Sequence, residues 1–454
     1  MENCAIILAA AEDDSMRTAD TKVMLDVAGK PVVSWVKKAL DQAGIHDQMY
    51  IVSYRQEKVR EELGESVAFA LQEVPLGTGH AVTQAEPFLF ERKGATVVMA
   101  GDTPLIKGET ISRLINNFEK GSWGALVLTA KLEDPSGYGR IVRNDDGDLI
   151  AIVEEEESDE ETKMISEVNS GIYCFDTELL YKAMSQIEER EERDLGRFPL
   201  TDVIDILARQ GVRVGAQNID PLEFFKVINR YDISVASREL NDRILRRIMK
   251  EGVTILDPMT TWIDDDVAIG KDTVILPSTR IHNSCVIGEN CTIGPNTTLN
   301  FTYVGDNSTI TQSEVRQASI DKNCQIGPWV HLVDGVELAE NCVIGSNVEI
   351  RNSRLGADCQ VHNLASISQA TLGEGVTVGS QVSFAYDSID GEEGITVGNH
   401  SVIDSQACLI APVQLAENSY VGAGTTVNRD IPKNALVVGR KDLEIIENWV
   451  LRRR

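Results

Sequence analysis

The sequence is poor in basic residues for its length. Its 454 residues include 43 Lys and Arg against 71 Asp and Glu, which gives a formal net charge of -28. Binding to nucleic acid without regard to sequence requires a basic surface. This balance therefore argues against nucleic acid as a partner and favours a solvated, self-repelling surface.

Long apolar runs are also missing. No stretch approaches the roughly 20 residues that a membrane-spanning helix requires, so we expect no membrane partner. The first residues, Met1-Glu2-Asn3, do not form a cationic signal region. A cytoplasmic location is therefore expected.

Closely paired cysteines are absent. None of the eight cysteines belongs to a Cys-x-x-Cys motif, so the sequence predicts neither a zinc site nor a dithiol redox motif. Several lie beside Ile or Val, for example in Cys342-Val-Ile344. We expect them to be buried small hydrophobic residues in a reducing compartment.

The loop after the first predicted strand contains no glycine. Residues 5–22 read AIILAAAEDDSMRTADTK, an apolar strand followed by a loop with Lys22 just beyond it. Loops in that position bind phosphates through glycines and a cation. This loop instead carries Glu12, Asp13 and Asp14, so the arrangement of a nucleotide site is present while much of its chemistry is altered.

Up to about residue 220, short apolar runs alternate with helical segments. The runs are continuous, which is typical of strands buried on both faces of a mostly parallel sheet, and cover residues 5–10, 48–53, 95–101 and 125–131. A helical segment over 33–43 lies between the first two. The pattern predicts a doubly wound α/β domain with ligands at the strand ends.

After a helix predicted over 231–250, the sequence pattern repeats with a different period. Apolar residues form one stripe of that helix, and Gly252 supplies a stop. From about residue 253 the period is six, as in Val286-Ile-Gly288 and Thr377-Val-Gly379. Hexapeptide repeats of this kind predict a parallel β-helix. The predicted parts are therefore 1–226, 227–252 and 253–454.

Several short motifs stand out in both halves. They are Leu8 to Met16 with Lys22, Gln72 with Pro75-Leu-Gly-Thr-Gly-His-Ala81, Gly101-Asp-Thr-Pro-Leu105, Asp134-Pro-Ser-Gly-Tyr-Gly-Arg-Ile141, Val153-Glu154, Asn169-Ser-Gly171, Leu200-Thr-Asp202 and Arg354-Leu-Gly356. Over nearly the whole chain these motifs resemble the bacterial bifunctional uridyltransferase/acetyltransferase family that makes UDP-N-acetylglucosamine. The resemblance implies a Rossmann-like nucleotidyltransferase domain, a linker helix and a left-handed parallel β-helix that forms homotrimers.

The resemblance also implies ligands and the residues that bind them. In that family the N-terminal domain transfers UMP from UTP to a sugar-1-phosphate, and the β-helix acetylates glucosamine-1-phosphate with acetyl-CoA. The implied nucleotide-binding residues are Ala11, Lys22, Gln72, Gly77 and Thr78. The others are Gly137, Glu154 and Asn169 for the sugar, Asp102 for Mg²⁺, and Ser405, Ala423 and Arg440 for acetyl-CoA.

Several N-terminal positions depart from the family pattern. The family's loop glycines are replaced by Ala11 and Asp13 and its arginine by Ser15. Ile228 stands where the family has a metal-binding asparagine, and Asn229 is a substitute only after a one-residue shift. An acid within about 4 Å of a phosphate costs roughly 1 kcal/mol in a water-like dielectric and about 4 at a dielectric of 20. Both loss and retention of uridylyl transfer stay open.

The positions for acetyl transfer differ as well. Asn363 replaces the family's general-base histidine and cannot accept a proton, and the adjacent His362 is expected to face another way. Val333 replaces an arginine, Arg351 a lysine and Ser366 a tyrosine. Loss of one general base alone costs about 10²–10⁴-fold, so we predict that acetyl transfer is lost.

Three functions are compatible with these substitutions. The first is a sugar-nucleotide-binding, largely non-catalytic homologue that regulates or scaffolds a partner. The second is a surviving sugar-1-phosphate nucleotidyltransferase, slow or retuned, that uses Lys22, Asp102 and the new acids. The third is a structural trimer whose N-terminal motifs bind nothing.

Overall fold

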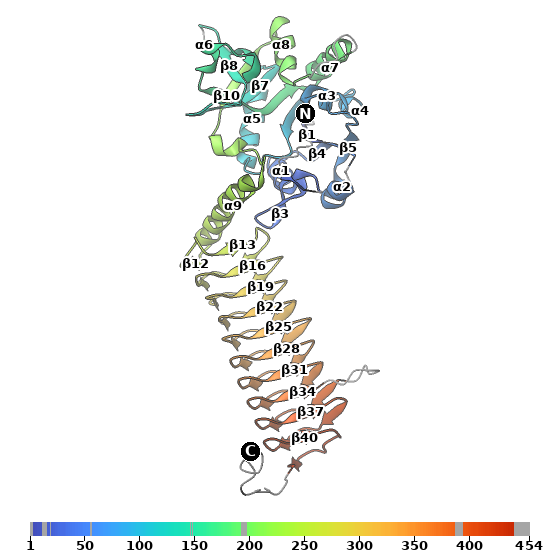
Figure 1. Ribbon diagram of the computed structural model, residues 1–454, viewed down its shortest axis with the longest axis vertical. Helices are drawn as coiled ribbons and strands as arrows, with labels where there is room; N and C mark the ends of the chain where they lie inside the picture. The colour runs from blue at the N-terminus through green and yellow to red at the C-terminus, as the bar shows by residue number, and fades with distance from the viewer. Residues whose placement is uncertain are drawn as a thin grey trace, which may run out of the picture. The chain divides into compact units, whose positions relative to one another are not determined.

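Figure 1 shows a computed structural model of the chain. It describes residues 3–10, 16–18, 20–54, 57–145, 147, 149–191, 198–385 and 394–439. The chain packs as two compact units, residues 1–240 and 241–454. The division of the chain at 226 and 252, with a separate linker between, stays a prediction.

A mixed sheet forms the centre of the first unit. Among the described residues it has nine strands, and its main path runs β11-β7-β10-β6-β1-β4-β5. β10 is antiparallel to both neighbours, whereas the other pairs on this path are parallel. The strands are β1 (Cys4–Ala9), β4 (Asp47–Val52), β5 (Ala68–Leu71), β6 (Ala95–Ala100), β7 (Ala125–Lys131), β8 (Arg140–Arg143), β9 (Leu149–Val153), β10 (Glu167–Asp176) and β11 (Val214–Asn218).

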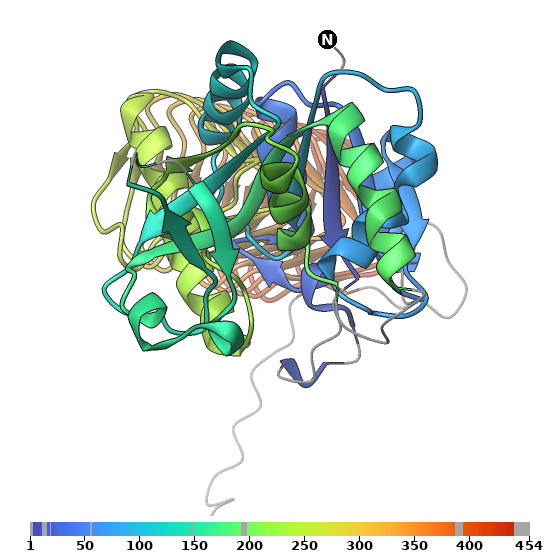
Figure 2. The same cartoon turned by 90° about the horizontal axis from the view of Figure 1, so that it is seen from above.

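The continuous apolar runs are explained by burial on both sheet faces. Ile7 and Val97 belong to one core, and their neighbours Ile6 and Val98 to the other. Helices cover both faces, as Figure 2 shows from above. The helices are α1 (Val32–Gln42), α2 (Glu57–Leu63), α3 (Thr78–Thr83), α4 (Glu86–Leu89), α5 (Gly108–Gly121), α6 (Glu160–Lys163), α7 (Thr177–Glu191), α8 (Thr201–Arg209) and α9 (Arg230–Lys250). The predicted α/β class is confirmed.

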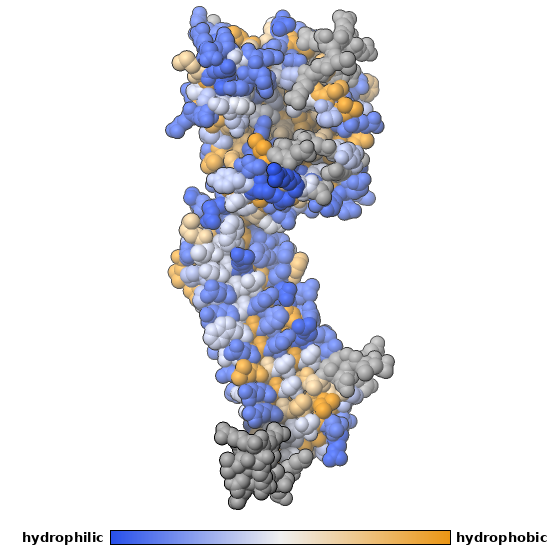
Figure 3. All heavy atoms as spheres, in the orientation of Figure 1, coloured by the Kyte–Doolittle hydropathy of each residue, from blue (hydrophilic) through white to orange (hydrophobic). Residues whose placement is uncertain are grey.

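Short connecting elements lie between these helices and strands. The single turns are η2 (Lys22–Met24), η3 (Gly64–Ser66), η4 (Glu155–Glu157) and η5 (Pro221–Phe224), and β2 (Asp26–Val27) pairs with β3 (Lys30–Pro31). No described helix is both long and apolar enough to cross a bilayer. On the face in Figure 3, hydrophilic residues dominate the first unit and hydrophobic ones are scattered, as the high charge predicts.

The second unit is a parallel β-helix, as the hexapeptide period predicts. Its short strands stack in three sheets, visible as successive coils in Figure 1. One sheet runs from β12 (Thr254–Ile255) to β41 (Leu436–Val437), the second from β13 (Trp262–Ile263) to β40 (Thr426–Val427), and the third from β14 (Ala268–Ile269) to β38 (Val413–Leu415). In most hexads the central aliphatic residue is buried, for example Ile293, Ile310 and Ile326.

A column of small polar side chains connects the coils of this β-helix. The Cys324, Cys342 and Cys359 thiols each donate to a carbonyl of the next coil, at 3.3, 3.3 and 3.1 Å. Ser308 does the same in an earlier coil. Seven cysteines are buried as predicted, and Cys408 is only partly buried. The thiols thus act both as small core residues and as hydrogen-bond donors.

Candidate functional site

The carboxyl end of β6 carries Asp102, next to the point where the strand order reverses beside β1. Ligands of open α/β sheets gather at such points. Lys22 Nζ lies 2.5 Å from Asp102 Oδ2, and both side chains are only 11% exposed. Asp102 Oδ1 is buried and has no hydrogen-bond partner among the residues that the structure describes. The structure therefore brings these two predicted site residues into one ion pair.

The segment that should supply a second metal ligand lies beside Asp102. The Val227 amide donates to the Asp102 carbonyl oxygen at 3.0 Å, so Ile228 follows directly. The aliphatic side chain of Ile228 offers no ligand atom. Asn229 Oδ1 instead accepts from the amides of Tyr231 (2.8 Å) and Asp232 (3.2 Å) and caps α9.

The described residues around Asp102 do not by themselves form a complete magnesium site. Asp102 Oδ1 is the buried carboxylate oxygen without a partner at this end of β6. No cluster of three His, Cys, Asp or Glu that would hold a metal occurs in the described parts of the chain. Mg²⁺ is commonly bound by one or two carboxylates together with substrate phosphates. The role of Asp102 as a metal ligand stays a prediction.

The segment predicted to bind the nucleotide runs from Gln72 to Thr78, the first residue of α3. Gln72 is buried, and its Nε2 donates to the Gly77 carbonyl at 3.2 Å. Thr78 Oγ1 accepts from the Leu200 amide at 2.8 Å. Gly77 has φ +125°, and a Cβ there would lie 2.5 Å from the Phe198 carbonyl oxygen. The structure thus assembles Gln72, Gly77 and Thr78 in one loop.

The three predicted sugar-contacting segments also come together. Glu154 Oε1 accepts from Thr201 Oγ1 at 3.1 Å. Glu154 Oε2 lies 3.2 Å from the position of a Cβ on Gly139, and the Asn169 amide donates to the Gly139 carbonyl at 2.8 Å. Gly137 has φ +83° and open space in front of its Cα.

Burial perturbs the carboxyl group of Glu154. Burial raises its pKa above the usual value, and the Thr201 hydrogen bond partly opposes this. Among nearby charges, Glu156 raises the pKa of Glu154 and Lys226 lowers it. Partly buried acids with perturbed pKa values are typical of functional sites.

Asn169 is fixed by its own neighbours in β10. Its Nδ2 donates to Tyr173 Oη at 2.6 Å, and its Oδ1 accepts from the Gly171 amide at 3.0 Å. The register with β7 shifts between Asn169 and Tyr173, which marks a bulge. Bulges of this kind redirect side chains next to active sites.

Sequence reasoning missed a buried arginine beside this cluster. Arg140 is almost fully buried, and its Nη2 lies 2.6 Å from Glu155 Oε2. Its Nη1 also donates to the Tyr138 carbonyl. These contacts hold the start of β8 against η4, next to Gly139 and Glu154. Its place within Gly-Arg-Ile was the available signal, but burial is not visible in the sequence.

The histidine position of the β-helix has a structural occupant. Asn363 Oδ1 accepts from the Ser346 amide at 2.9 Å and lies against Gly345. Its amide therefore holds the turn of the neighbouring coil. His362 is exposed, as expected for a surface residue. Neither position provides a buried general base.

The two β-helix positions at which the family has an arginine and a lysine, Val333 and Arg351, offer no unpaired cation in the described structure. Val333 of β25 (His331–Val333) is buried. Arg351, at the end of β28 (Glu349–Arg351), lies 3.1 Å from Glu349 and 3.6 Å from Asp334. Two acids therefore share its charge.

Two of the three predicted acetyl-CoA positions are described and lie on adjacent coils. The Gly424 amide donates to the Ser405 carbonyl at 2.9 Å, and Ala423 precedes it and is exposed. Arg440 lies outside the described residues, as do Ala11 and the loop residues Glu12, Asp13, Asp14 and Ser15.

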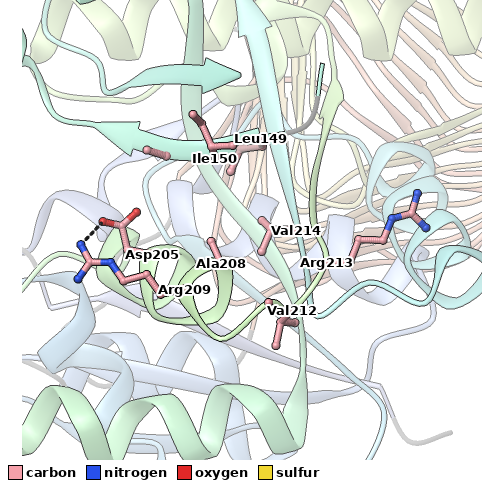
Figure 4. Close-up of a pocket in the computed structure, with 10 residues that line it drawn as sticks. Leu149, Ile150, Asp205, Ala208, Arg209, Val212, Arg213 and Val214 are labelled. Atoms are coloured by element: carbon pink, nitrogen blue, oxygen red, sulfur yellow. Dashed lines mark ion pairs between the residues drawn. The ribbon is translucent and has the colours of Figure 1, made fainter. Parts of the chain in front are cut away.

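An open pocket of about 490 Å³ lies near β9, α8 and β11 and contains none of the predicted residues (Figure 4). Leu149, Val212 and Val214 line it, together with the Asp205–Arg209 ion pair at 3.9 Å. It holds no pair of groups suited to acid–base or nucleophilic chemistry.

The fold and the grouped residues define a class of protein, a nucleotidyltransferase-like domain joined to a hexapeptide-repeat domain. The nucleotidyl transferase family model matches residues 17–218. The model for bacterial transferase hexapeptides (six repeats) matches 266–301 and 317–352.

Full-length relatives give the family. The chain is 38% identical to the bifunctional protein GlmU of Acetivibrio thermocellus over 451 residues, 99% of this chain and 97% of the relative. It is 37% identical to the same-named protein of Brevibacillus brevis over 439 residues, 96% and 95% of the two chains. The chain belongs to the bifunctional GlmU family, which confirms the resemblance read from its motifs. Its family is therefore that of UDP-N-acetylglucosamine synthesis.

Proposed function

We propose that this protein binds a uridine-diphosphate sugar and that it has lost acetyl transfer and most or all uridylyl transfer. The expected ligands are UTP or UDP-N-acetylglucosamine and a sugar-1-phosphate. The proposal also includes a cytoplasmic homotrimer. A non-catalytic protein of this kind would act on a partner as a regulator or scaffold.

The single observation that carries the proposal is the set of contacts made by Asp102 and its neighbours. One of its oxygens is bound by Lys22, and the neighbouring ligand position holds Ile228. Asn229 is committed to capping α9. Uridylyl transfer with a metal at Asp102 would need a second protein ligand, which the described residues do not provide.

The recognition residues support retained binding. Gln72 and Thr78 lie at the two ends of one segment, and Glu154 and Asn169 lie together with the Gly139 turn. Burial of a carboxylate costs stability that hydrogen bonds offset. Glu154 accepts one such bond, from Thr201, and a sugar hydroxyl that donates to Glu154 would supply another.

Acetyl transfer would lack both the general base and the cations at the family's arginine and lysine positions. Asn363 cannot remove a proton from an amine, and its side chain is engaged in a turn. Arg351 is paired with two acids and Val333 is buried. Any acetyl-CoA bound near Ser405 and Ala423 would therefore meet no activated amine.

A surviving nucleotidyltransferase is the second candidate. The partnerless Asp102 Oδ1 favours it, because substrate phosphates could bring a metal to that atom. Lys22 would then have to leave Asp102 and bind a phosphate. A structural trimer that binds no ligand is the third.

Ligand-dependent melting separates binding from a purely structural role. A ligand present at 100 times its Kd stabilises the native state by about 2.7 kcal/mol. UDP-N-acetylglucosamine should raise the melting temperature of the full chain, and the Asn169→Ala variant should respond less. An unchanged melting temperature at millimolar ligand, confirmed by calorimetric titration, would refute the proposal and favour the structural trimer.

A further inference from the structure

Lys226 lies in the segment between η5 and α9 and extends over the predicted sugar cluster. A Cβ placed on Gly171 would lie 3.8 Å from Lys226 Nζ, so the ammonium group lies over the backbone of Gly171. The side chain is partly buried. Gly171 follows Asn169 in β10, so the ammonium group belongs to the same surface as Asn169.

This ammonium group makes no direct contact with an acid in the described parts of the chain, and its charge acts on Glu154 only at longer range, where it lowers the pKa of that carboxyl group. It makes neither an ion pair within 4.0 Å nor a hydrogen bond there. Other partly buried lysines in the first unit are paired, Lys22 with Asp102 and Lys107 with Glu223. Lys226 therefore stands out as a cation that is available to a ligand.

The position of Lys226 connects the two groups of predicted site residues. Its Nζ lies beside Gly171, and the next residue, Val227, is hydrogen-bonded to Asp102. A sugar that contacts Glu154 and Asn169 with its C1 substituent directed toward Asp102 would place that substituent along this segment. A phosphate on C1 would then reach the ammonium group.

We propose that Lys226 binds the phosphate attached to C1 of the sugar, in a sugar-1-phosphate or in the sugar-proximal phosphate of a nucleotide sugar. The inference rests on the proposed function and adds to it a residue that the motif comparison did not provide. An ammonium–phosphate contact is charge-assisted and stronger than a neutral hydrogen bond. Its removal should weaken binding by about tenfold or more.

Calorimetric titration of the full chain tests this assignment. The probes are N-acetylglucosamine-1-phosphate, UDP-N-acetylglucosamine and uridine, and the variants are Lys226→Met and Lys226→Arg. Lys182→Met is the control, because it also removes one positive charge but lies in an exposed α7 ion pair with Glu178. Melting of each variant without ligand verifies that it is folded.

The Lys226→Met variant should bind both phosphorylated sugars about tenfold more weakly and uridine as the original protein does. Lys226→Arg should retain most of the affinity, and Lys182→Met should match the original protein. The difference should shrink as salt is added. A structural role of Lys226 alone would not discriminate between uridine and the phosphorylated sugars.

Three results would overturn the inference, and they are distinguishable. If the original protein binds and Lys226→Met binds both phosphorylated sugars equally well, Lys226 does not contact the phosphate, and the proposed function stands. If the original protein binds none of the probes, the proposed function fails and the inference fails with it. A loss confined to uridine would place Lys226 at the base and also contradict the assignment.

Discussion

The Gln72–Thr78 segment and the β-helix turn at Asn363 differ in how residues at predicted site positions contribute to the fold. In the segment, residues predicted to bind nucleotide also hold the backbone, as Gly77 does against Phe198. In the turn, a residue that only holds the backbone occupies the position of a predicted catalytic group. The presence of Gly77 is therefore weak evidence of binding, because the fold alone requires it.

Glu154 is a stronger indicator of function for the opposite reason. Its burial raises its pKa, so the charged form is disfavoured in the folded protein. Residues that cost stability are expected where function requires them. The comparison thus separates site residues that the fold needs from those that it only tolerates.

The largest expected effect is the loss of the Arg140–Glu155 pair. Arg140→Ala should destabilise the protein by about 3–5 kcal/mol, because it removes a side chain that is only 2% exposed, leaves a cavity in its place and breaks the ion pair with Glu155. Arg143→Ala is the matched control, since the Arg143 side chain also pairs with an acid (Glu167, 2.7 Å) but is 32% exposed, so its removal should cost about 1 kcal/mol or less. Urea unfolding of both variants measures the difference. Equal costs would show that burial of Arg140 contributes nothing.

A smaller effect is expected at Gly77. Gly77→Ala should cost about 2–3 kcal/mol, because φ is +125° and the new Cβ would meet the Phe198 backbone. Gly137→Ala shares a positive φ of +83° but meets open space, so about 1 kcal/mol is expected. Thermal unfolding of the two variants compares them. If Gly137→Ala is the more damaging, crowding at Phe198 is not what requires Gly77.

Glu154 should show a trade-off between stability and binding. A raised folded-state pKa means that its stabilising contribution is complete below its unfolded-state value and is lost as the pH rises through its folded-state value. Glu154→Gln should therefore stabilise the ligand-free protein at pH 7, by about 1 kcal/mol or less, and less so near pH 4. The same variant should bind UDP-N-acetylglucosamine more weakly.

Melting curves of the two proteins at pH 4 and pH 7 measure this difference. Thr201→Val is a useful companion, because it removes the hydrogen bond to Glu154 while keeping the carboxyl group. A Glu154→Gln protein that is less stable than the original at pH 7 would contradict the raised pKa.

The smallest effect is expected in the thiol column of the β-helix. Cys342→Ser should change stability by less than about 1 kcal/mol, because a hydroxyl can donate to the Gly356 carbonyl in place of the thiol. Ser308 already plays this part in an earlier coil. Cys342→Ala is the control that removes the donor. A larger loss in the serine variant than in the alanine variant would refute this account.

Periodicity was sufficient to predict most of the fold. Apolar runs of strand length predicted β1, β4, β6 and β7, and the six-residue period predicted the β-helix. The antiparallel β10 was not predicted, because strand direction depends on connections rather than on the composition of the strand. The thiol hydrogen bonds were also missed, since the coil-to-coil register is needed to find them.

Site residues could be predicted from the sequence only where they belong to a recognisable motif. Motifs gave Lys22, Asp102, Glu154 and Asn169, which the structure brings into neighbouring clusters. Lys226 belongs to no motif, and its importance comes from its position over Gly171. The involvement of Asn229 in a helix cap likewise follows from local geometry that a register comparison does not contain.

The central claim is that the protein still binds its ligands but no longer catalyses uridylyl transfer. Measuring pyrophosphate release tests the loss of catalysis most directly. The purified chain is given saturating UTP, N-acetylglucosamine-1-phosphate and magnesium, with a Lys22→Met variant as control. Ordinary enzymes turn over at about 1–10³ per second. The account predicts a rate at least about 10³-fold below the lower of these values, close to that of the control. Turnover of about 1 per second or faster, abolished in the Lys22→Met variant, would contradict it.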